Sequence, residues 1–165
     1  MKRYEQLSDR VSGMLRLYRD IFGIQRRHLS GLEVRVPALE SLQIKARLEE
    51  GLPLLDKGGL EIDAERLLEI MDEVKDLLAR RSRRGGDARR SLTALELDRD
   101  EAEGLARARL QGDYAMIEKK AEEMGVDADV LGLMLHASLV PFFQKAAQAL
   151  HPQADLDQGL SAACP

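Results

Sequence analysis

The sequence predicts an all-α protein, an irregular or orthogonal bundle of about six helices around one central apolar helix. Apolar residues recur at helical spacing through most of the chain. Hydrophobic residues make up 44% of the 165 residues but aromatic residues only 4%, with no Trp, so aliphatic side chains must build the core. Finally, the segment near 127–150 is apolar nearly all the way round, and such a helix needs other helices to cover it.

Three helices are predicted in the first half of the chain. A helical period runs from about residue 5 to 29, and a shorter helix is expected over 37–50, between a proline and Gly51. Residues 52–62 have no helical period and contain proline and glycine, which indicates an extended connection across the bundle. Asp63 is a suitable N-cap for the strongly amphipathic helix that follows.

That helix leads into an arginine-rich stretch, residues 80–90, where six arginines surround a double glycine. Few apolar side chains can anchor the backbone there, so we expect a mobile loop. Residues 92–110 predict one helix or a broken pair, and residues 113–124 a further helix. Gly125 then predicts the end of that helix and Asp127 the N-cap of the central helix, so a compact turn joins the two.

Inside the central helix, Pro141 removes a backbone donor and leaves the carbonyl of Ala137 without its usual partner, which predicts a bend. The bend can simply fit the helix to its neighbours. Alternatively, Phe142 and Phe143, just beyond it, present a surface to a partner protein. His136 has no second metal-ligating residue one turn away, so neither a metal nor a catalytic role is expected for it.

The arginines Arg80, Arg81, Arg83 and Arg84 are candidate partner-binding residues, because a guanidinium pairs well with phosphates and carboxylates. An acidic protein surface is the favoured partner, since the stretch lacks the aromatic residues that accompany many nucleic-acid sites. Neither double glycine matches a phosphate-binding motif. We therefore expect no catalytic residue, no enzyme activity and no cofactor in these 165 residues; a small enzyme would need converging polar groups that the spacing does not supply.

Overall charge and cysteine content indicate the compartment. The net charge of -4 gives no general reason to expect nucleic acid or acidic lipid as a partner. A single cysteine excludes an internal disulfide framework and is typical of a reducing environment. The first ten residues lack the apolar run of a secretory signal, and the proline, histidine and charges of 127–150 argue against a membrane span. We expect a cytoplasmic protein that does not bind membranes.

The sequence ends in Cys164 and Pro165, after a polar stretch that we expect to be a linker from residue 151. A cysteine followed by proline after a linker often begins a metal knuckle, in which a second cysteine lies three residues later. A lone cysteine is equally an ordinary surface thiol. The residues alone leave both interpretations open.

The sequence also contains five short motifs: Gly51-Leu-Pro-Leu-Leu-Asp, Gly112-Asp-Tyr, Ala121-Glu-Glu-Met-Gly-Val-Asp, Leu139-Val-Pro-Phe-Phe and Cys164-Pro. Together they resemble the formate dehydrogenase accessory protein family of the FdhE type. The resemblance covers roughly Glu50 to Pro165, and the first fifty residues share only the helical character.

The resemblance implies a cytoplasmic assembly factor that binds the molybdenum- or tungsten-containing catalytic subunit of respiratory formate dehydrogenase. It also implies a helical domain, residues 1–150, followed by rubredoxin-like or zinc-ribbon modules that hold iron or zinc. Cys164 would be the first ligand of such a site, which is incomplete here because a tetrahedral site needs four. The rival interpretation is a helical regulator or nucleic-acid-binding adaptor that uses Arg80–Arg90.

Overall fold

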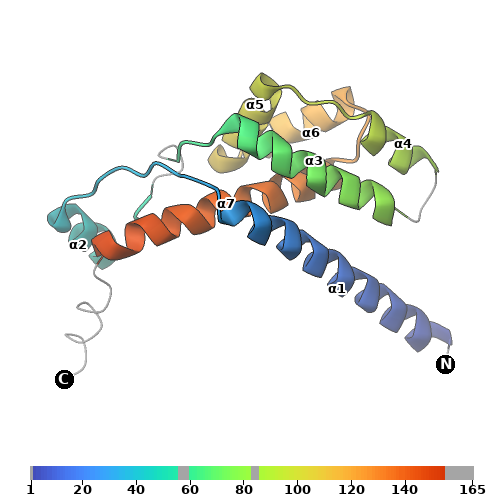
Figure 1. The fold of residues 1–165 in the computed structure, drawn as a ribbon, viewed down its shortest axis with the longest axis horizontal. Coiled ribbons are helices and arrows are strands. Elements are labelled where there is room, and N and C mark those ends of the chain that lie inside the picture. The colour runs from blue at the N-terminus through green and yellow to red at the C-terminus, as the bar shows by residue number, and fades with distance from the viewer. Residues whose placement is uncertain (1, 56–59, 83–85, 155–165) are drawn as a thin grey trace.

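The computed structural model describes residues 2–55, 60–82 and 86–154, and this part of the chain contains seven helices and no strand. The all-α prediction is confirmed. The helices are α1 (Lys2–Leu29), α2 (Ser41–Glu49), α3 (Ala64–Arg81), α4 (Gly86–Ala94), α5 (Arg99–Gln111), α6 (Tyr114–Glu123) and α7 (Ala128–Ala154), as drawn in Figure 1.

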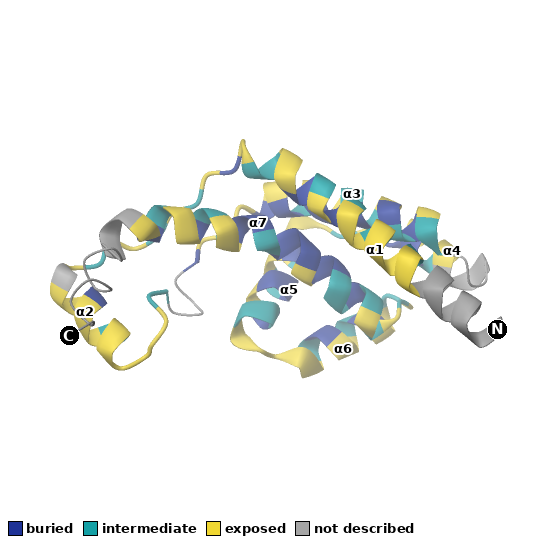
Figure 2. Ribbon diagram, turned by 90° about the horizontal axis from the view of Figure 1, so that it is seen from below, coloured by how far each residue is buried: buried dark blue, intermediate teal, exposed yellow. Residues whose placement is uncertain are grey.

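The core forms around α7, which contacts α1, α2, α3, α5 and α6, whereas α4 packs on α3 (Figure 1). Its largest side chains, among them Met134, Leu135, Leu139 and Phe142, are fully buried. They meet a stripe of α3 that includes Leu67 and Ile70, in the region coloured as buried in Figure 2. The prediction of a central apolar helix is therefore confirmed.

By length and composition, the segment Ala128–His151 of α7 is the one candidate for crossing a membrane among the described residues. Half of its most apolar window is buried by the rest of the protein. The core helix of a soluble protein has the same properties, and the packing of five other helices around α7 is consistent with that interpretation.

Local capping signals predicted most helix boundaries correctly. The Asp63 carboxylate accepts hydrogen bonds from the backbone N–H groups of Glu65 and Arg66, at 3.0 and 3.2 Å. Asp127 caps α7 in the same way. Gly125, in the turn before Asp127, has φ of +65°, a left-handed conformation that favours glycine, so this compact turn is confirmed.

Two predictions differ from the structure, and a third, which left two alternatives open, is resolved. The helix expected from residue 37 begins at Ser41, where the side chain of Gln43 accepts a hydrogen bond from the Glu40 N–H. The mobile loop expected over 80–90 is wrong for most of its length, because α3 continues to Arg81 and α4 starts at Gly86; residues 83–85 lie outside the described part. Residues 92–110 form the broken pair, α4 and α5.

The predicted boundary at residue 150 is also displaced, since α7 continues to Ala154. Residues 151–154 are therefore helical, not the start of a linker. The remaining residues of the predicted linker, 155–165, lie outside the described part of the chain.

Pro141 lies inside α7, and the helix is continuous through it. The carbonyl of Ala137, which Pro141 leaves without a backbone donor, accepts a hydrogen bond of 2.8 Å from the side-chain amide of Gln25 in α1. Gln25 is 5% exposed and is one of two buried polar residues in the described core. A side chain from another helix thus replaces the hydrogen bond that proline removes.

This replacement predicts a coupling between two residues that are far apart in the sequence. Gln25→Leu leaves the buried Ala137 carbonyl without a donor and should lower the free energy of unfolding by about 1–3 kcal/mol. Pro141→Ala restores a backbone N–H at position 141. In the Pro141→Ala background, Gln25→Leu should lower the free energy of unfolding by at least about 0.5 kcal/mol less than it does in the wild-type protein. A double-mutant cycle measured by urea unfolding gives this difference. Equal costs in both backgrounds would contradict the proposed replacement.

Candidate functional site

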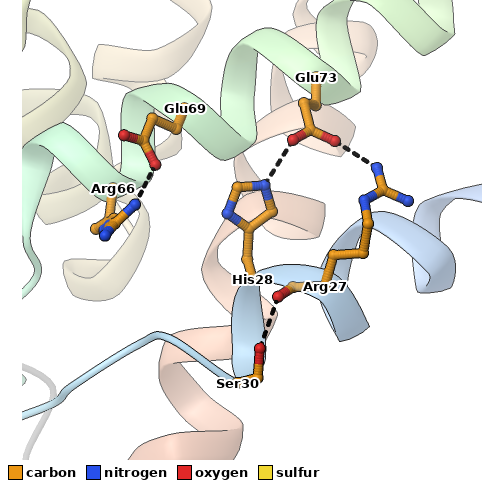
Figure 3. A network of polar contacts seen from close by, with 6 residues as sticks. All are labelled: Arg27, His28, Ser30, Arg66, Glu69 and Glu73. Atoms are coloured by element: carbon orange, nitrogen blue, oxygen red, sulfur yellow. Dashed lines mark hydrogen bonds and ion pairs between the residues drawn. The ribbon is translucent and has the colours of Figure 1, made fainter.

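Three polar contacts between α1 and α3 position the candidate site. Glu73 of α3 accepts a hydrogen bond from Arg27 Nη2 at 2.5 Å, and its other oxygen lies 2.8 Å from His28 Nε2 (Figure 3). Farther along both helices, Arg81 of α3 forms an ion pair with Asp20 of α1. His28, near the C-terminal end of α1, thus joins the two helices.

These contacts lower the pKa of both carboxylates, Glu73 and Asp20. Burial on its own raises the pKa of Glu73, but the hydrogen bonds and charges of His28 and Arg27 outweigh burial and lower this pKa. Burial on its own also raises the pKa of Asp20, but Arg81 together with Arg19 lowers this pKa below its ordinary value. The two acids are therefore held in their charged forms by the arginines and the histidine around them.

A groove with a volume of about 1230 Å³ lies between α1 and α3. Its apolar surface comes from Met14, Leu17, Ile24 and Leu77. Its charged lining consists of five arginines and three acids, which are Arg16, Arg19, Arg27, Arg80, Arg81, Asp20, Glu73 and Asp76. The groove is open and wide, and its dimensions suit a segment of polypeptide better than a small metabolite.

A second face of α1 carries an exposed apolar stripe. Five large side chains are between 43 and 66% exposed, although their spacing places them on one side of the helix. They are Val11, Met14, Leu15, Tyr18 and Phe22, and we call them the α1 stripe. The rings of Tyr18 and Phe22 lie against each other with centroids 6.4 Å apart. Exposed apolar surfaces of this kind mark protein interaction sites.

The two arginines of the predicted site that the structure describes have different environments. Arg80 is exposed and lines the groove. Arg81 also lines the groove, but its guanidinium pairs with Asp20. Arg83 and Arg84 lie outside the residues whose placement the structure describes.

Of the two aromatic residues predicted to face a partner, Phe142 is buried and Phe143 is exposed. Phe142 has no exposed surface and belongs to the core, so it cannot present itself to a partner. Phe143 is 40% exposed and lines a second, mainly apolar hollow of about 420 Å³, together with His136 and Leu60. The reason is rotational: successive helical residues point about 100° apart, so the core side of α7 takes Phe142 and not Phe143.

No group of three or more His, Cys, Asp or Glu residues that could hold a metal ion is found among the residues described. Cys164 lies outside that part of the chain. Its assignment as a first metal ligand therefore stays a prediction, as does binding of iron or zinc in a larger protein.

Sequence reasoning identified the helical period of α1 but did not predict which part of its apolar side is exposed. Amphipathic spacing shows which residues share a side of a helix, and it carries no information about what covers that side. Ile21 and Ile24 are buried against the bundle, whereas Phe22 and Leu15 are not. The candidate site therefore had no sequence signal that distinguished it from a core face.

Comparison with known proteins gives no independent assignment. No family model matches the chain. No curated protein matches it, and no solved structure does.

The contacts of Glu73 and Asp20 predict acid sensitivity. Since both pKa values are lower in the folded than in the unfolded protein, the contacts add stability above the ordinary carboxyl pKa of about 4 and lose it as the pH falls through the folded-state values. The double variant Glu73→Gln/Asp20→Asn should therefore be less stable than wild type at neutral pH. In urea unfolding, this difference should shrink below about pH 4.

Glu122→Gln provides the matched control, because Glu122 is exposed and no described side chain pairs with it. It should leave the pH profile of stability unchanged. If the difference in stability between wild type and the double variant is as large in acid as at neutral pH, the role given to the two carboxylates is wrong.

Proposed function

We propose that this domain is the recognition module of a non-enzymatic assembly factor for respiratory formate dehydrogenase, and that it binds the catalytic subunit of that enzyme. The observation that carries a recognition role is the α1 stripe, five large apolar side chains that the bundle leaves exposed. Covering them with a partner removes apolar surface from water, and this is the main driving force for protein association.

The identity of the partner rests on the sequence motifs between Glu50 and Pro165, which resemble formate dehydrogenase accessory proteins. The α1 stripe lies outside that range and supports protein binding in general. On this proposal the factor acts in the cytoplasm, and iron or zinc is held by modules that Cys164 would begin. The domain itself supplies recognition.

A nucleic-acid adaptor that uses Arg80–Arg90 is the alternative. Exposed guanidinium groups at Arg80 and Arg89 are compatible with phosphate binding. However, Asp76 and Glu73 line the same groove as Arg80 and would repel a phosphate backbone. This mixed charge favours a protein partner.

The proposal predicts that charged substitutions in the α1 stripe abolish partner binding without unfolding the domain. Leu15→Glu/Phe22→Glu should reduce co-purification of the co-expressed catalytic subunit about tenfold or more, because two ionised carboxylates would have to be buried at the contact. The unfolding midpoint should change little, since both side chains are largely exposed.

Leu42→Glu is the control, as Leu42 is 77% exposed but belongs to α2. It should co-purify like wild type. If wild-type protein fails to retain the catalytic subunit, the formate dehydrogenase assignment is wrong; if the stripe variant binds as well as Leu42→Glu, the assignment of the surface is wrong.

A further inference from the structure

We propose that the groove between α1 and α3 is a docking site for an acidic amphipathic helix of a partner protein. The groove and the α1 stripe lie on different sides of α1 and share only Met14 at their edge, and the inference does not depend on which protein the partner is. It rests on the shape of the groove, its apolar lining and two arginines that have no ion pair.

The walls of the groove of about 1230 Å³ are α1, from Gly13 to Arg27, and α3, from Glu73 to Arg81. The ion pairs Arg27–Glu73 and Arg81–Asp20 join the two walls, so an incoming helix would lie along the groove over these pairs. Met14, which is 56% exposed, and the partly exposed Leu17 provide apolar surface for an incoming helix, whereas Ile24 and Leu77 are already buried beneath them.

The α1 backbone also leaves room for this helix. Gly13 and Gly23 both line the groove. A Cβ atom added at Gly13 would meet no heavy atom within 4 Å, and one added at Gly23 would meet only Arg27 Nη1 at 3.9 Å. This wall of the groove is therefore low and open.

The charges of the groove select the partner. Arg27 and Arg81 are neutralised by Glu73 and Asp20, the acids that also hold α1 against α3. The guanidinium groups of Arg16 and Arg80, in contrast, have no hydrogen bond or ion pair within the described part of the chain, and they outnumber Asp76, the acid of this lining that is also unpaired there. Carboxylates flanking the apolar face of an incoming helix would complement these two guanidinium groups.

A nucleic acid fits this groove less well. The described lining holds no aromatic side chain on which a base could stack. The apolar lining would also remain uncovered by a polyphosphate. An amphipathic helix uses both the charged and the apolar parts of the surface.

Fluorescence anisotropy with defined probes tests the proposal on the whole chain. One probe is a labelled amphipathic peptide about five helical turns long, with a leucine stripe flanked by glutamates. A second has lysine in place of every glutamate, and a third is a short DNA duplex. At about 0.15 M salt, wild-type protein should bind the glutamate peptide and neither of the other probes.

Arg16→Glu/Arg80→Glu should weaken binding of the glutamate peptide about tenfold or more and create binding to the lysine peptide, because the sign of the two free charges is reversed. Arg26→Glu is the matched control, since Arg26 is exposed on the same helix but does not line the groove. It should leave both affinities unchanged.

Gly13→Leu tests the shape of the groove without changing charge. The added side chain enters open space and should leave the unfolding midpoint within a few degrees of wild type while weakening the glutamate peptide. The proposal is overturned if wild-type protein does not bind the glutamate peptide, or if Arg26→Glu weakens it as much as the groove variant. Duplex binding that Arg16→Glu/Arg80→Glu abolishes would assign the groove to nucleic acid instead.

Discussion

The hydrogen bond from Gln25 to the carbonyl of Ala137 is the contact on which the arrangement of α1 depends. Pro141 creates a buried acceptor at the centre of the most apolar helix, and a buried carbonyl without a donor is costly. Gln25 supplies the donor from α1 and fixes both the position and the rotation of that helix on α7. Phe22 lies one turn before Gln25 and is nevertheless exposed, so the cover over this side of α1 ends between the two residues.

The same constraint explains why α1 has two different surfaces. Its C-terminal half is anchored by Gln25, by the buried Ile21 and Ile24, and by the contacts of Glu73. Its N-terminal half extends beyond the other helices, diverging from α3 (Figure 1). The α1 stripe extends from Val11 to Phe22 and the groove from Gly13 to Arg27, so both surfaces continue from the extended part of α1 into the part that α3 and α7 hold.

Capping residues account for the elements that could be predicted from sequence. Asp63 and Asp127 act on backbone groups two or three residues away, and Gly125 acts on its own dihedral angles, so neighbouring residues decide these boundaries. The arginine-rich stretch was predicted wrongly because composition was taken as evidence of a loop. Arginine is a good helix former, and α3 continues through Arg80 and Arg81.

The sequence by itself determined that this chain is helical, which segment is central, and that the Ala137 carbonyl needs a donor, since these properties depend on local spacing and local chemistry. Tertiary structure alone decided that Gln25 is that donor, that Phe142 is buried, and that the α1 stripe faces solvent. The physical reason is that burial and hydrogen-bond partners are set by segments distant in the sequence. A helical period defines a face of α1, and only the packing of α3 and α7 determines which part of it is covered.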